Sequence, residues 1–147
     1  MTNKTLFIAS DHAGFALKQL VRAHLAAKGW QVEDLGAHST ESCDYPLFAH
    51  ALCKEVLRTE HKGILICGSG IGMSVVANRH PGIRAALCTH EFHASACRAH
   101  NDANVLCLGE RVTGAGLACV LADLFLSTPF EGGRHQRRVE QIEGSIE

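Results

Sequence analysis

The chain has 147 residues, of which 46% are hydrophobic and 20% charged, and its net charge is −1 at pH 7. This length suits one domain with its own hydrophobic core, and the near-zero charge indicates no surface for a nucleic acid. No stretch approaches the ~20 apolar residues of a membrane span, and the N-terminus lacks the apolar segment of a signal peptide. We therefore expect one domain over residues 1–147, located in the cytoplasm, with neither a membrane nor a nucleic-acid partner.

Apolar runs alternate with helical patterns along the chain. Strands are predicted at residues 5–10, 30–36, 63–67, 83–88 and 104–109. Helices are predicted at 15–29, after Asp44, at 71–78, at 91–100, around 117–125 and, in a polar tail, from Arg134. This alternation with short connections predicts parallel strands joined by right-handed crossovers. The expected fold is α/β: a three-layer, doubly wound (Rossmann-like) five-stranded parallel sheet with a C-terminal tail helix.

Two local sequence features indicate the buried face of one predicted helix and the start of another. In the first, Leu17, Leu20, Val21 and Leu25 fall on one face, which we expect to be buried. Asp44 is a candidate N-cap for the second helix.

The cysteines and histidines carry little metal-binding signal. The seven cysteines have no C-x-x-C spacing and are scattered through apolar runs, which predicts reduced thiols that are mostly small buried hydrophobes. Among ten histidines, only His90 and His93 have a spacing suited to a metal. Because a second pair of ligands is missing, we expect structural or surface roles for these two.

A glycine-rich loop, Cys67–Gly68–Ser69–Gly70–Ile71–Gly72, follows the third predicted strand. Ligands of doubly wound sheets bind beyond the carboxyl ends of the strands, and such a loop can direct its N–H groups at a phosphate or at an oxyanion formed during a reaction. The spacing matches neither the dinucleotide fingerprint nor the P-loop. A thiol placed here favours the thiolate, which can act as nucleophile or base. From the pattern alone, a buried strand cysteine remains an equal alternative.

Several separate motifs, in order along nearly the whole chain, resemble those of the B-type ribose-5-phosphate isomerases, members of a ribose/galactose isomerase family. The motifs are Asp11–His12–Ala13–Gly14, Asp44–Tyr45–Pro46, the glycine loop with Ala77–Asn78, Gly82–Ile83–Arg84–Ala85, His100–Asn101–Asp102, Asn104–Val105–Leu106, Gly109–Glu110–Arg111–Val112 and residues 130–139.

The resemblance implies an enzyme of the pentose phosphate pathway that interconverts ribose 5-phosphate and ribulose 5-phosphate without a metal or organic cofactor. It implies that Cys67 is the base that moves a proton between C1 and C2 through an enediolate, which Ser69 and the loop amides stabilise. It implies that His100, with Asp11, opens the furanose ring. The implied phosphate ligands are His12, Arg111, Arg134 and Arg138, and the other implied substrate contacts are Tyr45, Gly68, Gly70, Ile71, Gly72 and Asn101.

Departures from the family pattern bear on the substrate. Some members carry threonine where this chain has Ser69, and a subgroup that lacks the cysteine carries a carboxylate base where this chain has Ser74. The presence of Cys67 argues against galactose 6-phosphate as substrate. An allose-6-phosphate isomerase and a non-catalytic nucleotide-binding module are the alternative functions.

Several of these residues also suit purely structural roles. Asp11 and His12 suit a helix cap, His100 suits a helix end, and the tail arginines suit a solvated charge run. Arg134 and Arg138 would nevertheless share one face of a helix.

The predicted topology separates the functional residues. His100 precedes the fifth strand and therefore lies at the sheet edge opposite Cys67. We expect His100 and the tail arginines to reach the site of a neighbouring subunit, in a homodimer or tetramer with shared active sites, and the tail from about 129 to 147 to pack on that partner.

Overall fold

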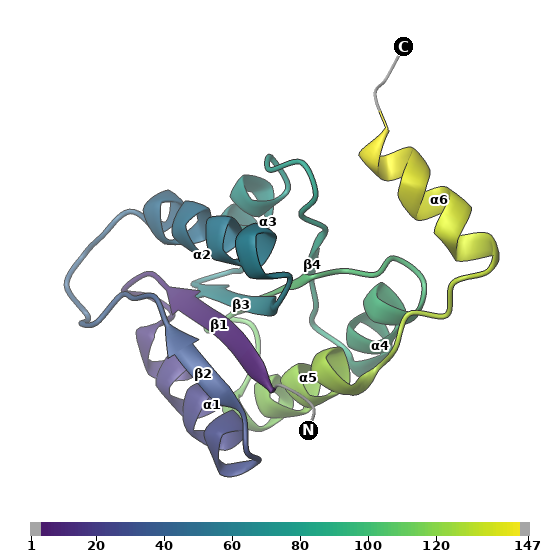
Figure 1. The fold of residues 1–147 in the computed structure, drawn as a ribbon. Coiled ribbons are helices and arrows are strands. Elements are labelled where there is room, and N and C mark those ends of the chain that lie inside the picture. Colours follow the sequence, from purple (N-terminus) through teal and green to yellow (C-terminus); the bar gives the residue numbers. More distant parts are fainter. Residues whose placement is uncertain (1–3, 145–147) are drawn as a thin grey trace.

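The structure is a computed structural model that describes residues 4–144, and it contains one five-stranded sheet with helices on both faces (Figure 1). Along the chain the elements are β1 (Thr5–Ser10), α1 (Phe15–Ala27), β2 (Gln31–Asp34), α2 (Tyr45–Thr59), β3 (Lys62–Cys67), α3 (Ile71–Ala77), β4 (Ala85–Leu87), α4 (Glu91–Ala99), β5 (Val105–Gly109), α5 (Ala115–Ser127) and α6 (Arg134–Glu143). The strand order is β2-β1-β3-β5-β4, and every pair is parallel. The predicted doubly wound α/β fold is confirmed.

Two apolar layers enclose the sheet, one on each face. Helices α2 and α3 cover one face, and α1, α4 and α5 cover the other (Figure 1). Strands β3 and β5 lie in the middle and are buried along nearly their whole length, as expected for a parallel sheet covered on both faces. Their carboxyl ends are therefore rigidly held. No helix of residues 4–144 is both long and apolar enough to span a bilayer.

The buried face of α1 differs from the prediction. Leu20 is 54% exposed, and the buried face contains Lys18 in addition to the predicted Leu17, Val21 and Leu25. The Lys18 ammonium is fully buried and is satisfied by Asp34 Oδ1 at 2.8 Å and by the carbonyl of Ala37. A hydrophobic pattern cannot reveal a buried lysine whose partner lies on another strand.

The predicted start of β4 was wrong, whereas the predicted N-cap position of α2 is confirmed. Strand β4 begins only at Ala85, since the backbone N–H of Arg84 donates to the side chain of Asn104 and that of Ala85 donates to Asn78. Asp44 does precede α2 in an extended conformation, but its side chain makes no cap hydrogen bond.

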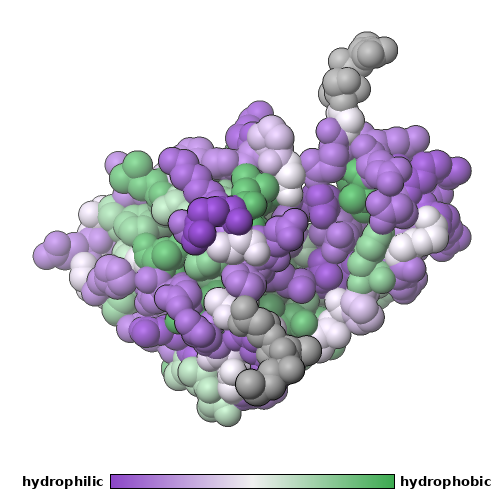
Figure 2. Space-filling model, in the orientation of Figure 1, coloured by the Kyte–Doolittle hydropathy of each residue, from purple (hydrophilic) through white to green (hydrophobic). Residues whose placement is uncertain are grey.

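Helix α6 stands apart from the sheet at the end of an extended connection (Figure 1). It is mostly hydrophilic on the face seen in Figure 2, although His135 and Val139 are buried. Its last residue, Glu143, accepts a hydrogen bond from the backbone N–H of Gly82 at 3.0 Å and forms an ion pair with Arg84. The predicted tail helix is confirmed from Arg134; residues 145–147 of the predicted tail lie outside the described residues.

Candidate active site

A cleft of about 610 Å³ opens at the carboxyl edge of the sheet, beyond β1 and β3. It is lined by residues from the loops after β1, β3 and β5 and from α2 and α3: His12, Ala13, Tyr45, Cys67, Gly68, Ser69, Ile71, Gly72, Val75, Arg111 and Val112. The loops after β1 and β3, which the sequence singled out, therefore meet in one cleft.

Cys67 lies on the floor of this cleft as the last residue of β3. Its side chain is 5% exposed, and its sulfur accepts a hydrogen bond from the backbone N–H of Gly70 at 3.1 Å. The neighbouring buried cysteines lie in apolar packing, where burial raises the pKa of the Cys53 thiol to about 12 and raises that of Cys107 well above its usual range. Cys67 thus differs from them in having a backbone donor and an opening to the cleft.

The loop that holds this sulfur is built by close backbone contacts. Gly70 has φ 78°, a left-handed conformation that L residues rarely adopt. A Cβ atom on Gly109, the β5 partner of Cys67, would lie 2.5 Å from the Ser69 carbonyl carbon. Side chains at these two positions would displace the loop, so the glycines fix its path over the end of β5.

Polar and aromatic groups line the same cleft as Cys67. The hydroxyl of Ser69 accepts a hydrogen bond from the backbone N–H of Ile71 at 3.2 Å, and the Tyr45 ring lies against Gly72. The Arg111 backbone N–H donates to the Gly68 carbonyl at 3.0 Å, and its guanidinium lies beside Gly68. A cationic fork, a hydroxyl and the thiol therefore face one small cavity.

Asp11 and His12 have separate structural roles. The Asp11 carboxylate is buried and accepts a hydrogen bond from the backbone N–H of Gly14 at 3.1 Å, at the start of α1. His12 lines the cleft, and its Nδ1 accepts a hydrogen bond from the backbone N–H of Cys43 at 3.2 Å. This contact assigns the imidazole proton to Nε2, which can then donate to an anion.

Four of the predicted site residues lie elsewhere in the same chain. His100, Asn101, Arg134 and Arg138 do not line the cleft around Cys67. The backbone carbonyl of Asn104, close after His100, pairs with Gly63 at the amino end of β3, and Cys67 is at the other end. Six residues of β3 span about 16 Å. Within one chain, the predicted site is therefore split between the two ends of the strands, the carboxyl edge and the amino edge of the sheet.

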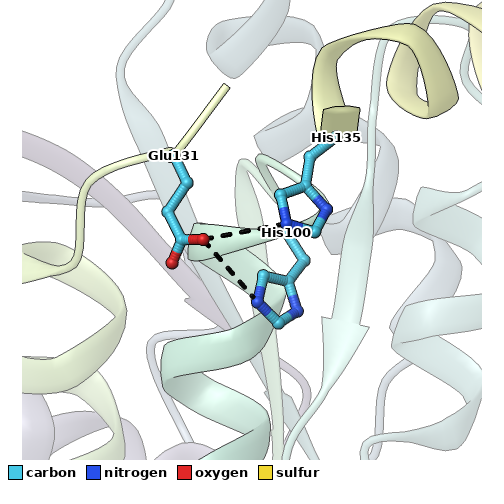
Figure 3. A group of neighbouring side chains, drawn as sticks. All are labelled: His100, Glu131 and His135. Atoms are coloured by element: carbon cyan, nitrogen blue, oxygen red, sulfur yellow. Dashed lines mark ion pairs between the residues drawn. The ribbon is translucent and has the colours of Figure 1, made fainter. Parts of the chain in front are cut away.

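At the amino edge, His100 is part of a cluster that the sequence did not suggest. Its imidazole stacks on that of His135 with ring centroids 4.4 Å apart, and the Glu131 carboxylate lies beside both rings (Figure 3). Desolvation and then the neighbouring His100 lower the pKa of His135. The only signal in the sequence was the four-residue spacing of Glu131 and His135.

Fold and cleft together define a class: a small doubly wound α/β protein with a thiol, a hydroxyl, an imidazole and a guanidinium in one cleft at the carboxyl ends of its strands. A family model described as Ribose/Galactose Isomerase matches residues 6–142. The chain belongs to the ribose/galactose isomerase family, and it is an isomerase.

Individual relatives agree with this membership. Ribose-5-phosphate isomerase B of Escherichia coli (strain K12) is 46% identical over 140 residues, which are 95% of this chain and 94% of the relative. A crystal structure of a ribose 5-phosphate isomerase from Thermotoga maritima is 50% identical, covers 97% of this chain and 99% of its own, and superposes with a TM-score of 0.94. The structure of Ribose-5-phosphate Isomerase B from Mycoplasma genitalium, with bound ribulose-5-phosphate, is 42% identical in sequence. The match covers 95% of this chain and 93% of that chain, with a TM-score of 0.91.

Proposed function

We propose that this protein interconverts ribose 5-phosphate and ribulose 5-phosphate by proton transfer through an enediolate, with Cys67 as the base. The observation that carries the proposal is the sulfur on the floor of the cleft, hydrogen-bonded by the backbone N–H of Gly70. The relatives from E. coli and M. genitalium, whose names specify this substrate or its product, support the choice of sugar.

The proposed reaction needs one base and an acceptor of developing negative charge. The Cys67 thiolate removes the proton from C2 of the open-chain aldose and returns it to C1, while the hydroxyl proton of O2 moves to O1. Negative charge collects on the enediolate oxygens during the transfer. The Ser69 hydroxyl and the N–H groups of the loop stabilise this charge, and they are fixed before the substrate binds.

The phosphate of the extended sugar requires hydrogen-bond donors and positive charge in the same cleft. Arg111 and His12 supply a guanidinium fork and an Nε2–H donor on the same cleft. Arginine binds phosphate oxygens in pairs, which orients the sugar as well as holding it. In this proposal the sugar hydroxyls contact Tyr45 and, from a second copy of the chain, Asn101.

A second copy of the chain completes the proposed site. His100 would take the proton from the C1 hydroxyl and give one to the ring oxygen, opening the furanose, but it lies at the other edge of its own sheet. Asp11, which binds the Gly14 N–H, then contributes by holding the β1 loop. Arg134 and Arg138 belong to α6, a helix that stands apart from the sheet (Figure 1). We propose that these groups reach the cleft of a partner in a homodimer.

The rim of the cleft supports this assembly. Three aliphatic side chains around the opening are strongly exposed: Ile71 at 57%, Val75 at 51% and Val112 at 58%. An apolar rim of this kind is typical of a surface that another protein chain covers. The partner would thereby both bury the rim and supply the histidine and arginines.

An isomerase assay on the purified protein in EDTA tests the proposal. We expect conversion of ribose 5-phosphate that survives chelation, with a higher kcat/KM than for allose 6-phosphate. A preference for allose 6-phosphate would overturn the choice of substrate. Thermal stabilisation by adenine nucleotides, with none by ribose 5-phosphate, would overturn the catalytic proposal.

A further inference from the structure

The cluster at the amino edge has the composition of a transition-metal site. Among residues 4–144, His100, Glu131 and His135 form the one group of three potential metal ligands whose ligand atoms all lie within 4.8 Å of one another. His135 Nε2 is 3.7 Å and His100 Nε2 is 4.0 Å from Glu131 Oε1. Both imidazoles therefore direct the same nitrogen toward one carboxylate (Figure 3).

Backbone contacts assemble these ligands from separate elements. The N–H of Glu131 donates to the carbonyl of Ala99 at 3.0 Å, which ties the connection after α5 to the end of α4, next to His100. The N–H of His135 donates to the carbonyl of Gly132 at 3.0 Å, which turns the chain into α6. The three side chains are thus brought together before any ion binds.

We propose that His100, Glu131 and His135 bind a divalent transition-metal ion such as Zn²⁺, and that the bound ion withdraws His100 from catalysis. Zn²⁺ bonds to histidine nitrogen and carboxylate oxygen are about 2.0–2.2 Å long, so ligand atoms on one tetrahedral ion lie about 3.3–3.6 Å apart. The two imidazole–carboxylate distances of 4.0 and 3.7 Å must therefore shorten slightly. The His100 ring must also turn out of its stack on His135 so that both nitrogens face the ion. The His100 and Glu131 side chains are 43% and 58% exposed and can rotate, while His135, at 11%, stays in place.

The ligand set also selects the kind of ion. Two imidazoles favour Zn²⁺, Ni²⁺ or Cu²⁺ over the oxygen-preferring Mg²⁺ and Ca²⁺. The Arg134 and Arg138 guanidinium groups act electrostatically on His135 and repel any cation. Binding must therefore come from bonds to nitrogen rather than from negative charge, which favours micromolar, reversible occupancy over a permanent structural ion.

Calorimetric titration of the full-length, metal-free protein with ZnCl₂ tests the site. We expect one Zn²⁺ per chain, bound with micromolar affinity, and no comparable binding of Mg²⁺. Glu131→Gln and His135→Ala should each weaken binding about 100-fold or more, because removing a ligand costs at least as much as removing the group that orients it. Glu131 is exposed, so its variant keeps the proposal testable even if His135→Ala fails to fold.

Two other histidine pairs provide matched controls. His50 and His80 have ring nitrogens 2.7 Å apart, and the rings of His90 and His93 lie 5.5 Å apart. His80→Ala and His93→Ala should leave the affinity unchanged. Unaltered affinity in both Glu131→Gln and His135→Ala, or its loss in a control variant, would overturn the site.

The effect on catalysis rests on the proposed function and is measured separately. Zn²⁺ should inhibit ribose 5-phosphate isomerisation with the same midpoint as binding, EDTA should reverse this, and Glu131→Gln should shift the midpoint upward. Full activity of the Zn²⁺-saturated protein would overturn the withdrawal of His100. An inactive metal-free protein would instead count against the proposed function, while the binding result would stand.

Discussion

The two edges of the sheet are built in opposite ways. At the carboxyl edge, Cys67 is nearly enclosed, and close backbone contacts at Gly70 and Gly109 fix the loop around it. At the amino edge, His100 is partly exposed, and the tail arginines sit on a helix that stands away from the body. Proton transfer at carbon requires a base fixed to within a fraction of an ångström. Binding a phosphate instead requires side chains that extend from α6 to the substrate. Changes at Cys67 and its loop should therefore act on kcat, and changes on helix α6, which we call the arm, should act on KM.

Cys67→Ala makes the largest expected change. Without the base, kcat for ribose 5-phosphate should fall about 10²–10⁴-fold, the usual contribution of a general base, while KM changes little because the phosphate ligands remain. Initial rates over a range of substrate concentrations measure both constants. Cys119→Ala, which removes a half-buried thiol outside the cleft, is the matched control and should retain full activity. Equal rates for Cys67→Ala and the wild type would remove the base from the mechanism.

Mixed assemblies test whether the two edges of different chains meet. A dimer of one Cys67→Ala chain and one His100→Ala chain keeps one intact site of two if sites are shared. Since random exchange makes half of the dimers mixed, about a quarter of wild-type activity should return.

The control mixes Cys67→Ala with Cys67→Ser chains, which restores no complete site. Activity that stays at the level of the separate variants in both mixtures would mean that each chain uses only its own residues.

Much of this contrast between edges follows from the sequence. Apolar runs of four to six residues predicted β3 and β5 because a strand covered on both faces must be apolar throughout, and the glycine loop after β3 marked the cleft. The separation of His100 from Cys67 followed from chain order in a parallel sheet.

Other features depend on contacts between distant segments, which a local pattern does not contain. The buried Lys18 requires Asp34, and the short β4 results from the side chains of Asn78 and Asn104. The stack of His100 on His135 exists only because the tail returns to the end of α4. Contacts of this kind form only when the chain folds, and they leave no repeating pattern in the sequence.

A substitution on the arm should change KM by an intermediate amount. Arg138→Ala should raise KM about 10- to 100-fold with kcat nearly unchanged, because a hydrogen bond to a charged group contributes about 1.5–3 kcal/mol. Arg137 is the matched control: it lies on the same helix and is also exposed, but is rotated away from the face shared by Arg134 and Arg138. Arg137→Ala should leave KM within about twofold of the wild type, as expected for an exposed charge. An equal rise in KM for both variants would indicate nonspecific attraction by the arm's positive charge.

The smallest effect concerns the contact that holds the arm. Glu143 joins α6 to Arg84 and to the Gly82 N–H. Glu143→Gln keeps an acceptor for the N–H but loses the ion pair, which for partly exposed groups is worth about 0–1 kcal/mol. A looser arm should place its arginines less often in the productive position, so KM should rise about two- to fivefold at constant kcat.

Glu140→Gln is the matched control for Glu143, since Glu140 bonds to Gln136 within α6 and not to the body of the protein. It should leave KM unchanged, and steady-state kinetics on both variants, with melting temperatures to verify folding, make the comparison. If Glu143→Gln lowered kcat at constant KM, the arm would affect the chemical step, and the division between a fixed catalytic edge and an adjustable binding edge would be wrong. If KM rose equally in both variants, the negative charge of α6 would matter rather than its attachment to Arg84.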